Sequence, residues 1–292
     1  MTRMHRWARL LVAAAVLGLS IAWLIWTFNG FSLSDAHAYR VAAERLLAGD
    51  DLYQPAATQG EAFRYAPWFA AAWVPIAALP RAVGDALWAI ALVAASVVAV
   101  LPLMKRPDLA PRLLAILGGT MLLWTAARGN VHPLLMMALV HGIDRRSGPI
   151  WVALAASLKA VPILFVLVYL ARREWWRAAW TVAITAALVA PMPLLGWEPG
   201  TVQAGESISL YYLVSPLAWL AGAAAAGVLA LIVAWRIPRY AAPAAAGAAI
   251  LALPRLLLYD LTYLLVGADQ ASVGRRTALS DGHHPDVRPS PG

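Results

Sequence analysis

The chain has 292 residues, of which 62% are hydrophobic and only 13% charged, and its mean hydropathy is +0.67. An ordinary soluble domain is about half apolar and about a quarter charged, so this composition excludes a soluble enzyme. Because the sequence has no cysteine, it also excludes disulfides, zinc–cysteine sites and thiolate nucleophiles. The net charge of +8 comes from Lys and Arg at the ends of apolar runs, which is typical of membrane topology and not of nucleic-acid binding. We therefore expect membrane lipids, and no nucleic acid, as partners.

The predicted fold is an all-α, polytopic transmembrane protein with about ten spans, within a range of roughly 8 to 12. Three uncharged stretches are long enough to cross a bilayer, at residues 10–28, 86–104 and 178–197. Two further stretches are predicted to be spans: residues 149–171, which contain one charge, Lys159, and residues 210–235, which begin with an interfacial tyrosine pair. Shorter stretches that cross, re-enter or pack inside lie at 65–80, 113–127, 131–143, 240–254 and 256–267.

The distribution of basic residues predicts a cytoplasmic N-terminus, because Arg3, Arg6 and Arg9 precede the first span and basic groups recur at 172–177 and 236–239. If all ten stretches cross, one basic loop lies outside, against the positive-inside rule. This loop contains Lys105, Arg106 and Arg112, so either it is an exception or one short segment does not cross.

The chain divides into an integral membrane domain at residues 1–267, located in the cell membrane, and a polar tail at 268–292. We expect the first span to stay uncleaved, because its apolar run exceeds a signal-peptide core. Residues 29–64 form an exoplasmic loop in this prediction. The tail is rich in Pro, Gly and charged residues, so its composition predicts disorder.

Within the first loop, residues 34–49 predict an amphipathic helix at the membrane surface, capped by Ser34 and ended by Gly49. Asp35 lies in its first turn. The apolar stripe comprises Tyr39, Ala42, Ala43, Leu46 and Leu47, with His37, Arg40 and Glu44 opposite.

Asp35 has two possible roles. A carboxylate near a helix N-terminus gains about 0.3–1 kcal/mol from the dipole, which is a common structural role and the one that spacing alone favours. The functional alternative is a general base at the boundary between water and membrane. Glu44 and Glu61 are the spare candidates, and His37 either orients Asp35 or faces water.

Lys159 lies inside a predicted span, where a charge costs about 2.5–3.5 kcal/mol unless it is paired or faces water. It either binds a ligand or forms an ion pair with Asp260. The acidic residues lack the spacing of a divalent-metal site, so we expect no metal and no cofactor.

Two further groups combine cationic and polar residues at segment ends. Arg128, Asn130 and His132 flank a helix break at Gly129, where they line a cavity or form an ordinary interhelical turn. Arg64 and Tyr65 precede a membrane segment and either bind a ligand or anchor the segment at the interface.

Several motifs, in this order, resemble those of glycosyltransferase family 87, a family of C-type membrane glycosyltransferases. The sequence departs from the family pattern in two ways: it lacks the Gln of the family's Gly-Gln-x-Asn stretch, and its C-terminal half is short. The motifs are Asp35-Ala-His-Ala-Tyr39, Leu46-Leu47-Ala-Gly49-Asp-Asp-Leu-Tyr53, Phe63-Arg-Tyr65-Ala-Pro67, Leu79-Pro80, Arg128-Gly129-Asn130-Val131-His132, Leu158-Lys159-Ala-Val-Pro162, the basic loop Arg172-Arg173-Glu-Trp-Trp-Arg177, and the segment from Pro254-Arg255 to Tyr259-Asp260.

This resemblance implies transfer of a sugar, usually mannose and in some members arabinofuranose, from a polyprenyl-phosphate donor. The acceptor would be lipid-linked or a polysaccharide on the exoplasmic face. The donor phosphate would be bound by Lys159, which we favour over its ion pair with Asp260, or by Arg128, and Arg64 with Tyr65 would hold phosphate or sugar. Asp35 matches the family's first-loop catalytic aspartate, which shifts our interpretation of this residue from a cap to a general base. The competing hypotheses are a polyprenyl-lipid transporter or flippase, and a degenerate structural member of the family.

Overall fold

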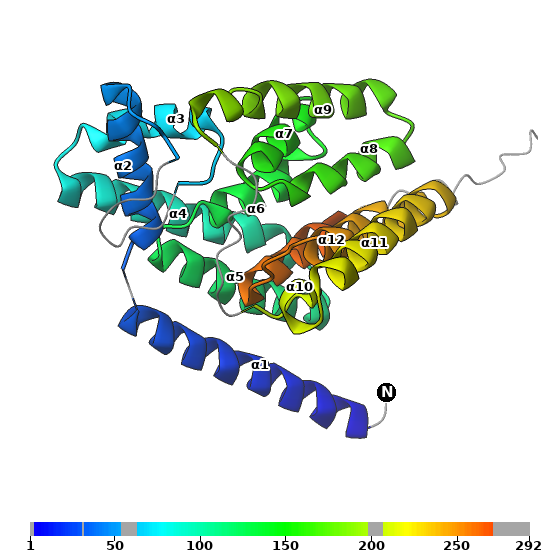
Figure 1. The fold of residues 1–292 in the computed structure, drawn as a ribbon. Coiled ribbons are helices and arrows are strands. Elements are labelled where there is room, and N and C mark those ends of the chain that lie inside the picture. The colour runs from blue at the N-terminus through cyan, green and yellow to red at the C-terminus, as the bar shows by residue number, and fades with distance from the viewer. Residues whose placement is uncertain (1–2, 31, 54–62, 198–206, 271–292) are drawn as a thin grey trace, which may run out of the picture.

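The computed structural model describes residues 3–30, 32–53, 63–197 and 207–270, and this part of the chain is helical, without strands (Figure 1). The predicted all-α fold class is therefore confirmed. The helices are α1 (Arg3–Asn29), α2 (Ser34–Ala48), α3 (Pro67–Ala77), α4 (Arg81–Met104), α5 (Leu109–Ala127), α6 (His132–Gly142), α7 (Gly148–Leu158), α8 (Val166–Ala171), α9 (Trp175–Val189), α10 (Leu210–Leu213), α11 (Pro216–Arg236) and α12 (Ala241–Leu251), with 3₁₀ turns η1 (Val161–Phe165), η2 (Pro193–Leu195), η3 (Pro238–Tyr240) and η4 (Leu258–Thr262).

Five helical segments in the described part of the chain are long and apolar enough to cross a bilayer: α1, α4, α5, α9 with η2, and α11. In α1, α9 and α11, only 11% of the most apolar stretch of each helix is buried inside the protein, against 33% in α4 and α5. Such apolar, outward-facing helices fit a lipid environment. The structure thus confirms a polytopic membrane protein, while the total of about ten crossings stays a prediction.

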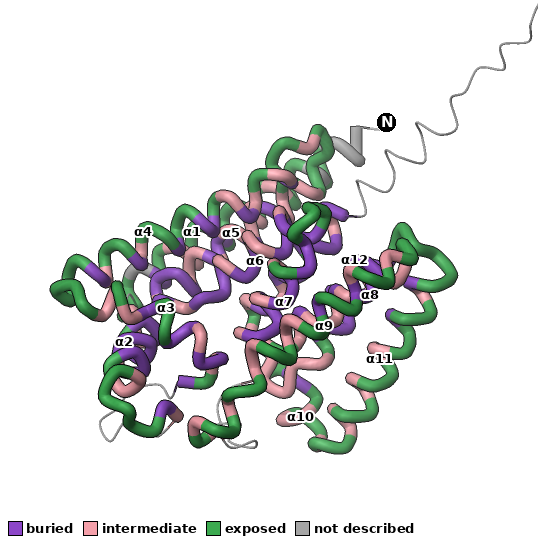
Figure 2. The backbone as a smooth tube through the Cα atoms, turned by 90° about the horizontal axis from the view of Figure 1, so that it is seen from above, coloured by how far each residue is buried: buried purple, intermediate pink, exposed green. Residues whose placement is uncertain are grey.

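The helices form a chain of neighbours around one buried core. α1 packs on α5, α5 on α4, α4 on α6, α6 on α7 and α7 on α9. α11 and α12 pack on each other, and contacts of α12 with η1 and of η4 with α5 join the C-terminal part to the rest. Figure 2 shows buried residues inside this arrangement and mainly exposed ones along α1 and α11.

The predicted single span at 149–171 is wrong. α7 ends at Leu158, and Lys159 takes an extended conformation with φ −136° and ψ 124°. Pro162 explains the break, because its ring excludes the helical hydrogen bond to the carbonyl four residues earlier. The two ends of the segment also lie together, since Arg177 donates to the carbonyls of Ile143 and Arg145 at 2.9 and 2.6 Å. The segment therefore enters and returns on the same side.

The segment at 65–80 does not carry the chain across the bundle. α3 ends beside the middle of α2, where Arg40 donates to the carbonyls of Ile76, Ala77 and Leu79 at 2.6–3.4 Å. Consequently α4 begins on the side of α2. This places Lys105 at the opposite end of α4 and removes the conflict with the positive-inside rule that a crossing at 65–80 creates.

The amphipathic helix expected at 34–49 is confirmed as α2, which ends at Gly49 with φ 73°. The predicted Ser34 cap is wrong: Leu33 is the N-cap, with φ 48° and no side-chain hydrogen bond. Tyr39 on the predicted apolar stripe is buried, while Leu47 is 69% exposed. Arg40, placed on the polar face by its spacing, is buried because its guanidinium binds the end of α3.

Two further segment boundaries differ from the expected ones. Pro216 interrupts the stretch 210–235, and α11 starts there with Ser215 accepting a hydrogen bond from the Ala218 amide at 3.1 Å. Residues 263–270 are helical, and Asp269 binds Arg106 at 3.0 Å. The membrane body thus extends past Gly267, whereas the expected disorder at 271–292 lies outside the described residues.

Candidate functional site

The candidate site forms where the start of α2 meets the turn between α5 and α6. The Asp35 amide donates to the Arg128 carbonyl at 3.0 Å, and the Leu33 amide donates to the Ala127 carbonyl at 3.2 Å. Gly129 makes this approach possible, because its φ is 76° and a Cβ there would lie 2.8 Å from the Ala36 Cβ. The backbone of the turn therefore fixes where the Asp35 side chain begins.

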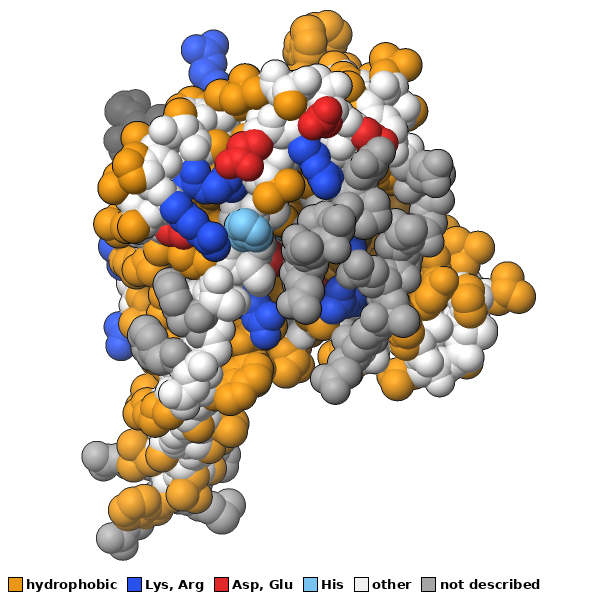
Figure 3. All heavy atoms as spheres, turned by 60° about the vertical axis from the view of Figure 1, so that its left-hand side comes forward, with side chains coloured by type: hydrophobic (Ala, Val, Ile, Leu, Met, Phe, Trp, Pro, Cys, Tyr) orange, Lys and Arg blue, Asp and Glu red, His pale blue; other side chains and the backbone are white. Residues whose placement is uncertain are grey.

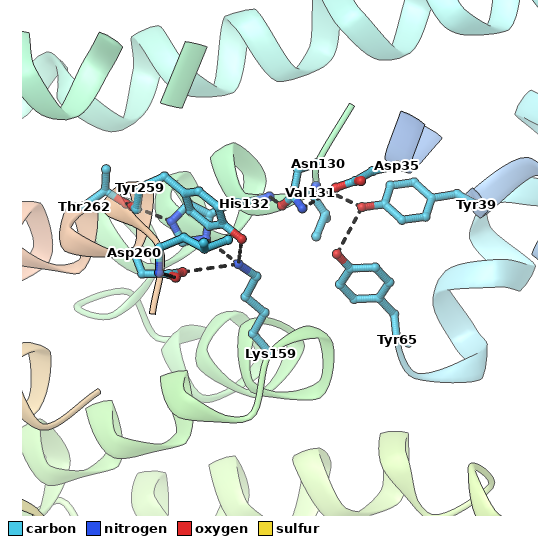
Figure 4. Close-up of polar contacts among 11 residues, drawn as sticks. Asp35, Tyr39, Tyr65, Asn130, Val131, His132, Lys159, Tyr259, Asp260 and Thr262 are labelled. Atoms are coloured by element: carbon cyan, nitrogen blue, oxygen red, sulfur yellow. Dashed lines mark hydrogen bonds and ion pairs between the residues drawn. The ribbon is translucent and has the colours of Figure 1, made fainter. Parts of the chain in front are cut away.

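The Asp35 carboxylate is 7% exposed and accepts a short hydrogen bond from the Asn130 side-chain amide (Figure 4). The other end of the Asn130 side chain accepts from the His132 amide at 3.0 Å. Asn130 is thus held at both ends, and its amide points at the carboxylate. A carboxylate with one fixed donor is an oriented hydrogen-bond acceptor and proton acceptor.

Two tyrosines form the neighbouring wall, as Figure 4 shows. The Tyr39 hydroxyl donates to that of Tyr65 at 3.2 Å and accepts from the Val131 amide at 3.3 Å. Burial is the main factor that raises the pKa of both phenols, and the negative charge of Asp35 raises it further. Both hydroxyls therefore stay protonated near neutral pH and act as hydrogen-bond donors.

A second polar group surrounds Lys159 on the other side of the turn (Figure 4). The Lys159 ammonium lies 3.4 Å from Asp260 Oδ1, 3.3 Å from the Tyr259 hydroxyl and 3.4 Å from His132 Nδ1. His132 is fully buried, and its Nε2 lies 2.8 Å from Thr262 Oγ1. The break after α7 thus places the lysine beside η4, and the Asp260 ion pair considered for it is present.

Two cavities meet at Asp35. The larger, of about 510 Å³, has a largely apolar wall into which polar residues are set, among them Asp35, Tyr39, Arg64, Tyr65, Lys159 and Asp260. The smaller, of about 450 Å³, is lined by Trp26, Asp35, Trp124, Thr125, Arg128, Asn130, Arg255, Leu257 and Tyr259. Asp35, Asn130, Arg255, Leu257 and Tyr259 border both. Figure 3 shows acidic and basic side chains gathered on the face over the α2 end of the molecule, with hydrophobic side chains around it.

The structure brings together most of the site residues predicted from the sequence. Asp35 and Asn130 border both cavities, Arg128 borders the smaller one, and Tyr39, Arg64, Tyr65 and Lys159 border the larger one. His37 is exposed on α2, and neither it nor His132 lines these two cavities.

Sequence reasoning did not single out three residues of the site: Arg255, Trp26 and Trp124. Arg255 lies within the Pro254–Asp260 segment of the family resemblance, and that was the available signal. The two tryptophans were indistinguishable from interfacial anchors. Of the spare carboxylates, Glu44 is exposed and borders neither cavity, and Glu61 lies outside the described residues.

No group of three His, Asp or Glu side chains among the described residues is close enough to hold a metal ion. The side chains that are present favour an anion instead, since Arg64, Lys159 and Arg255 line the larger cavity and Arg128 joins Arg255 in the smaller one. Guanidinium and ammonium groups are suited to phosphate.

The fold and the site define a class: a polytopic, all-α membrane protein whose first-loop helix carries a carboxylate to the junction of two cationic cavities. Residues 63–204 match the model of glycosyltransferase family 87, which confirms the resemblance over that segment. The chain is also 27% identical over 203 residues to a polyprenol-phosphate-mannose-dependent alpha-(1-2)-phosphatidylinositol pentamannoside mannosyltransferase of Mycolicibacterium smegmatis. That alignment covers 64% of this chain and 49% of the relative, so the chain spans about half of the relative's length. No solved structure matches the chain significantly.

Proposed function

We propose that this protein is a membrane glycosyltransferase that moves mannose from a polyprenyl-phosphate donor to a lipid-linked or polysaccharide acceptor. One observation carries the proposal: a buried carboxylate, Asp35, is oriented by Asn130 at the junction of two cavities lined by cations. The match to family 87 and the name of the mannosyltransferase relative support both the reaction class and the donor. The site faces the exoplasmic side in this proposal.

Asp35 acts as the general base. It takes the proton from the attacking hydroxyl of the acceptor as the oxygen bonds to the anomeric carbon of the donor sugar. The bond between that carbon and the phosphate oxygen breaks, and its electron pair leaves with polyprenyl phosphate. Because a phosphate is a weak base, its departure needs cationic stabilisation and no carboxylic acid, unlike the alkoxide leaving group of a glycoside hydrolase.

The other residues position the two substrates. Asn130 orients the carboxylate, and the Tyr65 phenol, which accepts from Tyr39, keeps its own O–H to donate into the larger cavity. Arg64 and Lys159 add positive charge there, and Arg128 adds it in the smaller cavity. His132 supports Lys159 from behind the cavity wall. His37 has no role in this mechanism, since it faces outward.

The test is transfer of labelled sugar from synthetic polyprenyl-phospho-mannose to membrane lipid acceptors by purified protein, compared with Asp35→Asn. Asp50→Asn is the matched control, because Asp50 is an exposed carboxylate in the same loop. We expect the control to transfer at the parental rate and Asp35→Asn to lose at least about a hundredfold, as is usual when a general base is removed. Equal rates for both variants would overturn the proposal.

A parallel reaction with the arabinofuranosyl donor distinguishes the sugars. We expect mannose transfer, as in the relative's name. Transfer from the arabinofuranosyl donor alone would support the same reaction and show that the sugar is arabinofuranose, not mannose.

A lipid transporter is the second candidate, favoured by the pair of half-buried Lys159 and buried Asp260 at a break between short helices. Such a protein would move polyprenyl lipids across vesicles independently of Asp35. Its activity would fall when the Lys159–Asp260 pair is removed. If no transfer is found with either donor, this vesicle assay decides between the two candidates.

A further inference from the structure

The turn between α5 and α6 is tied to its surroundings through its own carbonyl groups. Three successive carbonyls, those of Ala127, Arg128 and Gly129, each accept a hydrogen bond from another element. The first two accept from backbone amides within residues 32–35 at 3.0–3.2 Å. The third accepts from the indole N–H of Trp88 in α4, with 2.8 Å between Nε1 and the oxygen. Trp88 therefore adds a side-chain anchor on α4 to the backbone anchors at the start of α2.

The hydrogen bond from Trp88 acts on the most adaptable residue of the turn. Glycine adopts many backbone conformations at little cost, so Gly129 by itself does not determine the orientation of the next peptide group. That planar group joins Gly129 to Asn130. Its carbonyl accepts from Trp88, and its amide donates to the Thr125 carbonyl at 2.9 Å. The peptide group is thus held at both ends, which fixes the position of the Asn130 Cα.

Asn130 passes this position on to the carboxylate (Figure 4). Its side-chain amide donates the short hydrogen bond to Asp35, and its side-chain oxygen accepts from the His132 amide at 3.0 Å. Both hydrogen bonds depend on where the Asn130 Cα lies. A rotation of the peptide group away from Trp88 would therefore move the donor that orients Asp35.

Trp88 is itself fixed by its neighbours. Its side chain is 6% exposed and makes ring contacts with Tyr39 and Trp73. The centroid distances are 6.1 and 5.0 Å and the interplanar angles 87° and 64°, which are edge-on contacts that favour one orientation of the indole. Trp88 borders neither of the two cavities, so any effect it has on a ligand there is indirect.

Trp73 provides an internal comparison. It is 1% exposed, lies in the same aromatic cluster and also borders neither cavity. Its Nε1, however, is buried and has no hydrogen-bond partner among the described residues. The two tryptophans thus share burial and ring contacts but differ in the hydrogen bond to the turn. Removing only the indole N–H should therefore have different consequences at the two positions.

We propose that Trp88 is a positioning residue of the transfer reaction. By holding the Gly129 carbonyl it fixes Asn130, and Asn130 in turn directs the Asp35 carboxylate toward the acceptor hydroxyl. Trp88 itself contacts no substrate. This inference rests on the proposed function and adds to it the contact that keeps the general base oriented.

The kinetic test replaces Trp88 with 3-benzothienylalanine, an isostere that has sulfur in place of the N–H. We expect kcat for mannose transfer to fall about ten- to hundredfold, because small displacements of catalytic groups are costly. KM for the polyprenyl-phosphate donor should stay parental, since no contact with the donor is removed. The same replacement of Trp73 is the matched control and should leave both constants unchanged. Parental kcat after replacement of Trp88, or an equal loss at both positions, would overturn the proposal.

A double variant shows whether Trp88 acts through Asn130. Asn130→Ala alone should lower kcat, because the carboxylate loses its oriented donor. In that background we expect replacement of Trp88 to lower kcat by no more than about twofold, since residues that act through a shared partner are not additive. A general loss of stability would instead multiply with the effect of Asn130→Ala. Multiplying effects would therefore contradict the proposed route.

A second measurement of the same contact requires no turnover. The sequence has two asparagines, Asn29 and Asn130, so asparagine labelled with ¹⁵N gives a single labelled side-chain amide in Asn29→Gln. We expect the NMR signal of this amide to shift when the isostere replaces Trp88 and to stay in place when it replaces Trp73. An unchanged signal after replacement of Trp88 would show that Trp88 does not position Asn130.

The outcomes distinguish this inference from the proposed function. If Asp35→Asn transfers sugar at the parental rate while replacement of Trp88 shifts the Asn130 signal, the general base is refuted and the contact between Trp88 and the turn stands. If Asp35→Asn abolishes transfer while replacement of Trp88 changes neither kcat nor the Asn130 signal, only the role of Trp88 is refuted.

Discussion

Gly129 is the residue on which the geometry of the site depends most. Its φ of 76° is costly for an L-residue, by about 1–2 kcal/mol, and its missing side chain leaves room for Ala36. A Cβ at this position would push the start of α2 away from the α5–α6 turn. The distance between Asp35 and Asn130 would change with it.

We therefore expect Gly129→Ala to lower the transfer rate by at least about tenfold, since small displacements of catalytic groups are costly. Its Tm should fall as well. Gly247→Ala is the matched control, because a Cβ at Gly247 meets nothing within 4 Å. Initial rates and thermal melting of the two variants check this, and a Gly129→Ala protein as active as Gly247→Ala would show that the turn tolerates the shift.

Lys159 and Asp260 allow a test of how an ion pair behaves in a buried site. Removing one partner leaves an uncompensated charge, which typically costs about 3–5 kcal/mol, whereas replacing both with apolar residues is often neutral. We expect Lys159→Met to lower the Tm strongly and Lys159→Met/Asp260→Leu to restore most of it. Thermal unfolding in detergent measures both, and a double variant no more stable than the single one would contradict the pairing.

At the scale of elements, Arg40 joins α2 to α3. Its guanidinium donates hydrogen bonds to three carbonyls at the end of α3. The last carbonyls of a helix have no amide donor within the helix itself. Arg40→Met keeps the apolar stem and removes these hydrogen bonds, so we expect a loss of about 2–4 kcal/mol in unfolding free energy. Arg81→Met is the control, since its pair with Asp85 is exposed at the surface. Equal Tm values for the two variants would show that Arg40 does not stabilise α3.

The elements also show what the sequence can and cannot predict. The bounds of α2 followed from local signals, because Gly49 ends a helix by its own conformational freedom. The break at Lys159 was missed, since length and hydropathy favoured one span even though Pro162 signalled an interruption. Arg40 looked solvent-facing by its spacing, because its partners lie 36 or more residues away along the chain. The same holds for Arg255, whose place beside Asp35 depends on segments far apart in the sequence.

At the scale of the whole molecule, the contacts define two sides. Asp35, the α5–α6 turn and Arg255 meet at one end of the helices. At the other end, Arg106 binds Asp269, and Arg172 binds Asp144 and Gln270. With α3 not crossing, the loop of Lys105 joins this second, basic end. The positive-inside rule then supports the proposal that the second end is cytoplasmic and the Asp35 end exoplasmic.

The absence of cysteine from the sequence makes this topology directly testable. We expect Asp50→Cys to react with a membrane-impermeant maleimide on intact cells. Lys105→Cys should react only after permeabilisation. Both positions are exposed, so accessibility to water does not distinguish them. Labelling of Lys105→Cys on intact cells would mean that the segment at 65–80 does cross the membrane.

The central claim is that Asp35 is the base of a sugar transfer from a polyprenyl-phosphate donor. The measurement that tests it most directly is the single-turnover rate of Asp35→Asn with saturating polyprenyl-phospho-mannose, in protein shown to bind polyprenyl phosphate with the parental Kd. We predict that the donor binds while transfer falls at least about a hundredfold. Parental transfer by this variant would contradict the claim.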